Sequence, residues 1–437
     1  MTQPNATADH SPPPPTLLVG SRYGTVWLLH ADTGSVLWRQ TMGGRLGTLV
    51  HGGDTVYVPA YIPMPTAKHE EGPAPLAGWL HRGAVGAYPS RLTALRARDG
   101  ATLWICEGWS AGRSHLALDD NILLTDALDP AIGERTLSAI DSQTGDTHWS
   151  ISTGPPWGLR ERFITARAGR VYLRESTDPH VLDTRTGATL WSYEEREPQQ
   201  HYLSESGALL LTHDVPAASD ELLWAVRHVA DGTLVATLPP RSKPLALTDS
   251  AVYLSTQTRK PRLVALRFGD GAELWRVTVG ESDDIWGQCI ATDAALYFVR
   301  TMQRPRALAE VLAFDPTTGQ QLWRWHSPAH LLSLLRLWGR HTPEVLLFAF
   351  NEARRSAARA REERNRHIFY REVLRGQWRR PGALIGNILA TAGWGKVFIC
   401  TNMGVFALRA SDGHLLWHAL PTMDLSWITP ALPPESV

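Results

Sequence analysis

The stretch VLAFDPTTGQQLW at residues 311–323 decides the fold of this chain, because its pattern returns along the whole sequence. A β-rich run leads into a turn that holds a glycine, and a tryptophan stands four residues after that glycine. The pattern occurs seven times, at Gly34/Trp38, Gly100/Trp104, Gly145/Trp149, Gly187/Trp191, Gly271/Trp275, Gly319/Trp323 and Gly413/Trp417. An eighth glycine, Gly232, has Ala236 at the tryptophan position. Spacings of roughly 45 residues indicate a repeat protein.

Each repeat reads as short β-strands joined by turns. The first unit has the runs Leu17–Ser21, Thr25–Leu29 and Val36–Trp38, which is a hairpin pattern and not a helical one. Thr or Asp precedes every repeat glycine, and the pair is typical of a two-residue turn with a glycine at positive φ. We expect a fourth strand from the stretch after each tryptophan. Four-stranded units of this length are typical of propeller blades.

A small residue recurs on the middle strand of five units, at Ala94, Ala139, Ala265, Ala313 and Ala407. Because alanine leaves room for a bulky neighbour, we predict that the tryptophan of an adjacent unit packs there. A small residue opposite each docked tryptophan would then be required. Truncating such a tryptophan should cost roughly 3–5 kcal/mol.

The run Leu-x-Ala-Leu/Phe-Asp-x-x-Thr-Gly-x-x-Leu-Trp resembles the PQQ-like (quinoprotein alcohol dehydrogenase-like) β-propeller repeat, and it is clearest at Val311–Trp323 and echoed at Val26–Trp38 and Val405–Trp417. The resemblance implies an all-β chain that forms a single β-propeller. It implies eight four-stranded antiparallel blades, with tryptophans docked between them. The docking tryptophans would be Trp38, Trp104, Trp149, Trp191, Trp275, Trp323 and Trp417.

The repeats also set the domain boundaries. We expect a disordered Pro-rich leader at residues 1–15, the propeller at residues 16–430 and a tail at residues 431–437. Gly319 and Gly413 are 94 residues apart, about two periods, and strand-like runs such as Val345–Phe350 lie between them. Nine blades are therefore the alternative to eight.

Composition excludes several function classes. Acidic and basic residues balance at 43 each, so no global field attracts nucleic acid or membranes. The three cysteines, Cys106, Cys289 and Cys400, are too far apart in sequence to indicate a disulfide framework or a zinc site. Neither a signal peptide nor a run of apolar residues long enough to span a membrane is recognisable, so we expect a cytoplasmic protein.

Two insertions interrupt the period. The first, residues 61–91, is a Pro-rich loop containing His69 and His81, whose spacing does not favour a metal site. The second, residues 351–367, is predicted to be a basic helical segment. Its candidate partner-binding residues are Arg354, Arg355, Arg359, Arg361, Arg364 and Arg366. They could bind phosphates or an acidic partner, or they could form a solvated helix with internal ion pairs.

The sequence contains none of the common catalytic motifs, such as a nucleophile elbow, a P-loop or a dinucleotide fingerprint. The resemblance to quinoprotein dehydrogenases implies PQQ, calcium, a disulfide between adjacent cysteines and a catalytic aspartate, but this chain has no adjacent cysteines. A second branch of the family is a non-enzymatic lipoprotein subunit of the outer-membrane assembly machine. Such a lipoprotein needs an export signal that ends in an acylated cysteine, whereas the first cysteine of this chain is Cys106. This difference argues against the lipoprotein role.

We therefore predict a non-catalytic scaffold for protein interaction or ligand binding. We expect no catalytic residue, cofactor or metal, an unknown protein partner and no membrane. The alternatives are a degenerate PQQ- and calcium-dependent oxidoreductase, and binding of nucleic acid or an acidic partner through the Arg-rich insertion.

Overall fold

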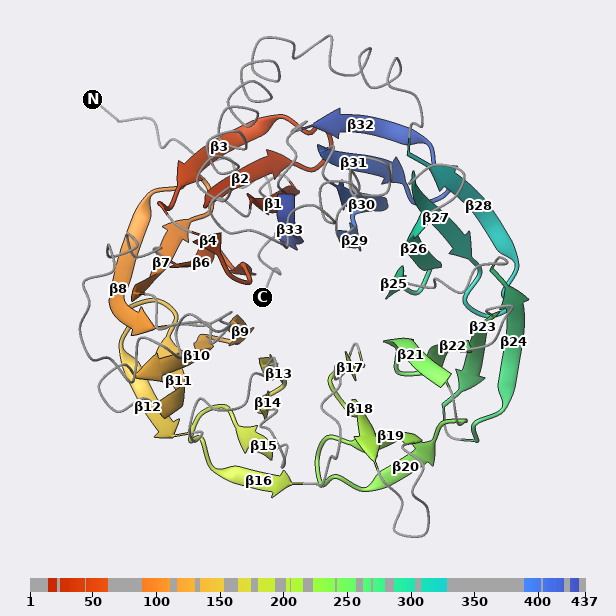
Figure 1. The fold of residues 1–437 in the computed structure, drawn as a ribbon, viewed down its shortest axis with the longest axis horizontal. Helices are drawn as coiled ribbons and strands as arrows, with labels where there is room; N and C mark the ends of the chain where they lie inside the picture. Colours follow the sequence, from red (N-terminus) through yellow and green to blue (C-terminus); the bar gives the residue numbers. More distant parts are fainter. Residues whose placement is uncertain are drawn as a thin grey trace, which may run out of the picture.

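The protein folds into a closed ring of eight antiparallel, four-stranded blades around a central axis (Figure 1). The computed structural model describes residues 15–21, 24–43, 45–61, 89–110, 116–129, 134–152, 164–173, 180–192, 202–204, 206–214, 223–239, 242–256, 262–268, 270–279, 287–302, 308–327, 389–401, 404–419 and 425–431. Every regular element within these ranges is a strand. The expected all-β, eight-bladed propeller is thus confirmed.

The strands of each blade follow one another from the axis outward. Blade 1 contains β33 (Leu425–Ala431), β1 (Thr16–Ser21), β2 (Thr25–His30) and β3 (Val36–Thr41). Blade 2 contains β4 (Arg45–Leu46) and β5 (Val50–Gly52), then β6 (Thr55–Tyr61), β7 (Pro89–Arg96) and β8 (Thr102–Ser110). Blade 3 contains β9 (Leu116–Asp119), β10 (Ile122–Asp129), β11 (Glu134–Asp141) and β12 (Thr147–Ser152). Blade 4 contains β13 (Ile164–Arg167), β14 (Arg170–Leu173), β15 (His180–Asp183) and β16 (Thr189–Ser192).

The remaining blades have the same order. Blade 5 contains β17 (Tyr202–Leu203), β18 (Leu209–Asp214), β19 (Leu223–His228) and β20 (Leu234–Thr237). Blade 6 contains β21 (Ser242–Leu247), β22 (Ala251–Thr256), β23 (Arg262–Arg267) and β24 (Glu273–Thr278). Blade 7 contains β25 (Gly287–Ala291), β26 (Leu296–Met302), β27 (Leu308–Phe314) and β28 (Gln321–His326). Blade 8 contains β29 (Leu389–Gly393), β30 (Lys396–Thr401), β31 (Gly404–Arg409) and β32 (Leu415–Ala419).

Two irregularities occur in blade 2. Its innermost strand is split, and both β4 and β5 pair with β6. A single pairing, Leu128 with Ser110, also joins β10 of blade 3 to β8 of blade 2, so hydrogen bonding runs continuously from one blade into the next. Figure 1 shows the two blades as separate radial sheets in spite of this bridge.

The ring closes inside blade 1. Strand β33 pairs antiparallel with β1, from Thr16 opposite Ala431 to Ser21 opposite Leu425. The expectation that each fourth strand follows its tryptophan is wrong, because the stretch after each tryptophan supplies the innermost strand of the next blade. Blade 1 therefore takes its innermost strand from the far end of the described chain.

The interface of blades 7 and 8 bears on the number of blades. The indole N–H of Trp323 in blade 7 donates to the carbonyl of Ala410 in blade 8 at 2.8 Å. Trp417 in blade 8 reaches Ala31 in blade 1 in the same way, at 3.0 Å. Blades 7, 8 and 1 are therefore direct neighbours, and no ninth blade stands between them.

The repeat turns are wider than predicted. In the first unit, the pairing of His30 N–H with the Ser35 carbonyl encloses four residues, Ala31 to Gly34, and the other seven turns have the same pattern. The repeat glycine is the fourth loop residue, with φ between 68° and 83° in all eight turns. A four-residue loop that ends in a left-handed residue favours glycine at that position. The prediction of positive φ is therefore confirmed, and the prediction of two-residue turns is wrong.

The hydrophobic core lies between the blades. One cluster joins Tyr297 and Trp323 of blade 7 to Ile399 and Phe406 of blade 8. Similar clusters occupy other interfaces, so each blade buries its two faces against its two neighbours.

Ala313, one of the recurrent alanines, has a different role from the one predicted. The strand register places Ala313 opposite Trp323 of its own blade on one side and opposite Tyr297 on the other. The two rings lie 5.7 Å apart across the alanine. Alanine is therefore suited to this position because two aromatic side chains of the same blade meet over it. The bulky partner is thus not a tryptophan from an adjacent unit.

A small residue opposite the tryptophan is also not required. Leu28 lies opposite Trp38 in blade 1, and Val181 lies opposite Trp191 in blade 4. Both tryptophans nevertheless dock against the next blade.

The two predicted insertions lie almost wholly outside the described residues. Residue 61 ends β6 and residues 89–91 begin β7, with Tyr61 opposite Ser90, so the loop between these strands is shorter than the expected 61–91. Residues 351–367 fall in the undescribed range. In the described ranges we find no helix with the length and apolar character needed to cross a membrane.

Candidate functional site

Seven of the eight junctions between blades share one structure, which we call the indole socket. A tryptophan on the outermost strand donates its indole N–H, at 2.5–3.1 Å, to the carbonyl three residues before the repeat glycine of the next blade. The glycine forms the floor of the socket, because a Cβ atom added there would lie 2.6–3.1 Å from the ring. The pairs of tryptophan and accepting residue are Trp38/Ala97, Trp104/Ser142, Trp149/Thr184, Trp191/Val229, Trp275/Pro316, Trp323/Ala410 and Trp417/Ala31.

The eighth junction, between blades 5 and 6, is different. Ala236 stands at the tryptophan position, opposite Val226 in the strand register. The floor glycine of blade 6, Gly271, has φ +68° like the others, but nothing lies within 4 Å of its Cβ position. A cavity of about 330 Å³ occupies the place of the missing ring.

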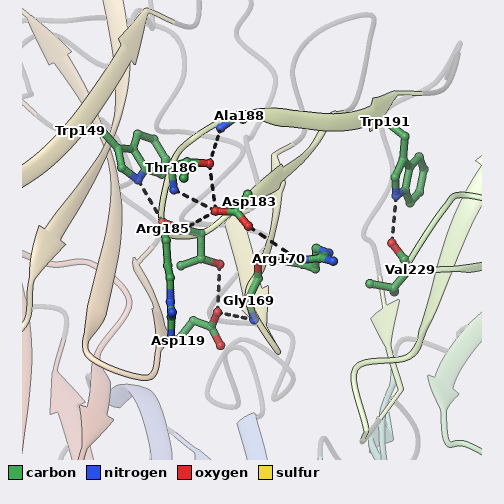
Figure 2. A network of polar contacts seen from close by, with 11 residues as sticks. Asp119, Trp149, Gly169, Arg170, Asp183, Arg185, Thr186, Ala188, Trp191 and Val229 are labelled. Atoms are coloured by element: carbon green, nitrogen blue, oxygen red, sulfur yellow. Dashed lines mark hydrogen bonds and ion pairs between the residues drawn. The ribbon is translucent and has the colours of Figure 1, made fainter.

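A polar network joins blades 3 and 4 (Figure 2). Asp119, at the end of β9, accepts hydrogen bonds from the backbone N–H of Gly169 at 2.7 Å and from the hydroxyl of Thr184 at 2.9 Å. The carbonyl of Thr184 in turn accepts the indole N–H of Trp149 at 3.0 Å. One carboxylate thus fastens two turns of the neighbouring blade beside its indole socket.

Asp183 stabilises a turn within blade 4. Its carboxylate accepts hydrogen bonds from the N–H groups of Arg185 and Thr186, at 3.0 and 2.9 Å, and lies 3.9 Å from the Arg170 guanidinium. Burial raises the pKa of Asp183, but the hydrogen bonds from Thr186 and Arg185 outweigh this, and the pKa is below its ordinary value. The group is therefore ionised at neutral pH and is committed to holding the turn.

A pocket of about 370 Å³ opens over this network. Its charged lining consists of Asp119, Asp120, Asp183, Arg170 and Arg185. Two of these carboxylates, Asp119 and Asp183, already accept hydrogen bonds within the protein, so the lining combines acidic and basic side chains that also hold the fold together.

Blade 7 contains a buried ion cluster. Glu310 on β27 has no exposed surface and receives the Nε groups of Arg300 and Arg324 at 2.5 and 2.6 Å. His326 Nδ1 lies 3.7 Å from the same carboxylate. The three neighbours come from the adjacent strands β26 and β28, so the cluster ties the outer three strands of this blade together.

The described residues do not fit the calcium and PQQ site that the resemblance to quinoprotein dehydrogenases suggests. Among them, no group of three or more His, Cys, Asp or Glu side chains is arranged to hold a metal ion. The three cysteines lie in blades 2, 7 and 8, and none of them forms a disulfide bond. Burial raises the pKa values of Cys289 and Cys400, which leaves both as neutral thiols.

The structure places the seven predicted docking tryptophans in the seven filled sockets. The six arginines from Arg354 to Arg366 lie outside the described residues, as do His69 and His81. No role for Asp119 or Glu310 was predicted from the sequence. Asp119 stands in an Asp-Asp pair that reads as an ordinary turn, and Glu310 interrupts an otherwise apolar strand.

Known proteins share this architecture. The profile of the family described as outer membrane protein assembly factor BamB matches residues 4–67, 89–219 and 211–354. No curated protein sequence matches the chain. Among solved structures, the chain is similar to dihydro-heme d1 dehydrogenase NirN in complex with DHE, with a TM-score of 0.58 and 14% identity over 98% of this chain and 79% of that one.

Two further solved structures are similar to the chain. Apo AztD from Citrobacter koseri has a TM-score of 0.53 and 9% identity, over 95% of this chain and 97% of that one. BamB from Moraxella catarrhalis has a TM-score of 0.47 and 17% identity, over 72% of this chain and 87% of that one. At these identities the likenesses to NirN and AztD show the fold alone. The family profile covers more than half of the sequence, so the chain belongs to the PQQ-like β-propeller family described as outer membrane protein assembly factor BamB.

Proposed function

We propose that this propeller is a non-catalytic scaffold whose outer wall binds a protein partner. The observation that carries the proposal is the exposure of large apolar side chains on the outermost strands of five blades, between 41 and 54%. These side chains are Val36, Leu37, Leu103, Ile105, Leu190, Leu234 and Leu322. Their strands, β3, β8, β16, β20 and β28, form the outer rim of the ring in Figure 1.

The most concentrated example is on β8. Leu103 and Ile105 are two residues apart and share one face of the strand, with 42 and 46% of their surfaces exposed. Apolar surface in contact with water favours burial against another molecule. Leu103 and Ile105 are therefore the most suitable starting point for mapping a partner.

Two further considerations support a binding role. The carboxylates of Asp119 and Asp183 accept hydrogen bonds that hold the turns of blade 4, so the structure gives both of them a structural role. The family is described as an assembly factor, and assembly requires surfaces that bind other proteins.

Site-specific photocrosslinking in the native cell tests the proposal. A benzophenone side chain at residue 103 or 105 should give the same protein adduct, and the probe at the exposed turn residue Asp293 serves as the control. The double variant Leu103→Glu/Ile105→Glu, examined with a probe at Leu37, should show whether the contact depends on this apolar face. Two results would overturn the proposal: no adduct above the Asp293 control, or turnover of alcohols or sugars by the purified protein with an artificial electron acceptor, PQQ and calcium.

A further inference from the structure

The junction of blades 5 and 6 contains every part of an indole socket except the indole. Gly271 supplies a floor with the same left-handed backbone as the seven filled sockets. Phe268, three residues before this glycine, occupies the sequence position whose carbonyl accepts the indole N–H in the other sockets. The turn that holds both groups has the same four-residue form, with Arg267 N–H on the Ala272 carbonyl at 2.8 Å.

The walls of the cavity are mainly apolar and come from both blades. Ala236 and Leu238 face it from blade 5, and Leu266 and Phe268 face it from blade 6. Phe268 is larger than its counterparts, which are alanine, serine, threonine, valine or proline, and it packs against the neighbouring apolar cluster. This ring only partly compensates for the missing tryptophan, because about 330 Å³ remain open.

We propose that this vacant indole socket binds a tryptophan side chain presented by a protein partner. Seven copies of the same site in the same molecule define the complementary group: a flat aromatic ring that packs on glycine and donates one N–H. Apolar cavities in proteins can bind small aromatic molecules, and a buried tryptophan is a frequent anchor of protein interfaces. The inference deepens the proposed function, on which it rests for the source of the tryptophan.

The socket itself can be tested without the partner. The probe is 5-fluoroindole, followed by fluorine NMR on the full-length protein, because the many native tryptophans obscure fluorescence. We expect saturable binding at one site, and about tenfold weaker binding of 5-fluoro-1-methylindole, which lacks the N–H donor.

Two variants fill the cavity from within, and one variant creates a matched site. Ala236→Leu and Ala236→Trp should abolish probe binding, and the smaller Leu variant remains informative if the Trp variant does not fold. Trp191→Ala empties the socket above Gly232 and should raise the number of bound probes from one to two. Absence of binding at millimolar probe, or binding that persists in both Ala236 variants, would overturn the proposal.

The remaining outcomes identify other occupants. If another segment of this chain fills the socket, the probe does not bind the intact protein, and the inference fails. If a second copy fills it, sedimentation shows a dimer that Ala236→Trp dissociates, and the inference fails again. If the crosslinked partner of the outer wall is retained at full yield in Ala236→Leu, the scaffold proposal stands, and only the tryptophan anchor is rejected.

Discussion

A Cβ atom added to Gly319 would lie 2.6 Å from Cδ2 of Trp275, a ring carried by the preceding blade. The repeat glycine therefore serves two purposes at once. It adopts the left-handed conformation of its own turn, and it lets an aromatic ring from another sheet lie directly on the backbone.

These two purposes can be separated by comparing Gly319→Ala with Gly271→Ala. Both glycines have almost the same φ, +70° and +68°, but only Gly319 carries a ring. Gly271→Ala should cost about 1–2 kcal/mol for the left-handed backbone alone. Gly319→Ala should cost clearly more, because its Cβ also displaces Trp275. Urea unfolding of the two variants measures the difference, and equal losses would contradict the role of the glycine as a socket floor.

Substitutions of Trp191 separate packing from hydrogen bonding in a filled socket. Trp191→Ala removes both the ring and the bond to Val229, and we expect a loss of about 3 kcal/mol. Trp191→Phe keeps an aromatic ring and removes the N–H donor, so it should lose about 1 kcal/mol from the missing bond, plus the cost of a smaller ring. Chemical denaturation gives both values. A Trp191→Ala protein as stable as the wild type would show that the ring does not hold the two blades together.

Removal of the Glu310 charge should destabilise blade 7 strongly, because it leaves buried arginine charge without a partner. Glu310→Gln leaves the guanidinium of Arg300, only 11% exposed, without its charged partner, and we expect a loss of about 3–5 kcal/mol. Glu273→Gln is the matched control, because Glu273 pairs with Arg276 on the exposed surface of blade 6. The control should lose at most about 1 kcal/mol. Similar effects of the two variants would mean that burial does not strengthen the Glu310 pairs.

The pH dependence of stability should carry a signature of His51. Burial lowers the pKa of His51 from 6.5 to about 4, in spite of the opposing charge of Asp54. The unfolded chain therefore binds a proton at higher pH than the folded one. This contribution to stability is complete above pH 6.5 and is lost as the pH falls toward 4, by an amount of up to about 3 kcal/mol.

Two measurements check this prediction. The imidazole resonances of His51 should titrate with a midpoint near pH 4. His51→Gln should lose less stability than the wild type when the pH falls from 6.5 to 4.5. A midpoint near 6.5 would show that the imidazole is solvated in the folded protein.

The sequence was sufficient to predict a propeller, because nearly every blade repeats the same local requirement, whereas the exact blade count and the strand order within each blade needed the structure. Seven repeats need both a glycine in a left-handed turn and a tryptophan four residues later. Both residue types therefore recur at fixed positions in the sequence. The same pattern marked Ala236 as the one departure from the series, and the structure shows that this departure leaves a socket without its indole.

Other features of the fold correspond to no recognisable pattern in the sequence. The pairing of β33 with β1 depends on backbone hydrogen bonds, which almost any β-forming sequence can make. The role of Ala313 depended on knowing which strands are neighbours, because Tyr297 and Trp323 flank it only through the register. The role of Glu310 depends on Arg300 and Arg324, which lie on two other strands. The spacing of these three residues in the sequence does not indicate that they are in contact.

The closure of the ring within blade 1 also has a consequence for biosynthesis. The ribosome releases β33 after every other described strand, so β1 has an unpaired edge for most of the time of synthesis. An exposed strand edge can pair with the wrong chain, and the nascent protein is most open to such errors at this point. The ring of blades closes only through non-covalent contacts that form after β33 has been synthesised. In these contacts β33 pairs with β1, and the indole N–H of Trp417 donates to the carbonyl of Ala31.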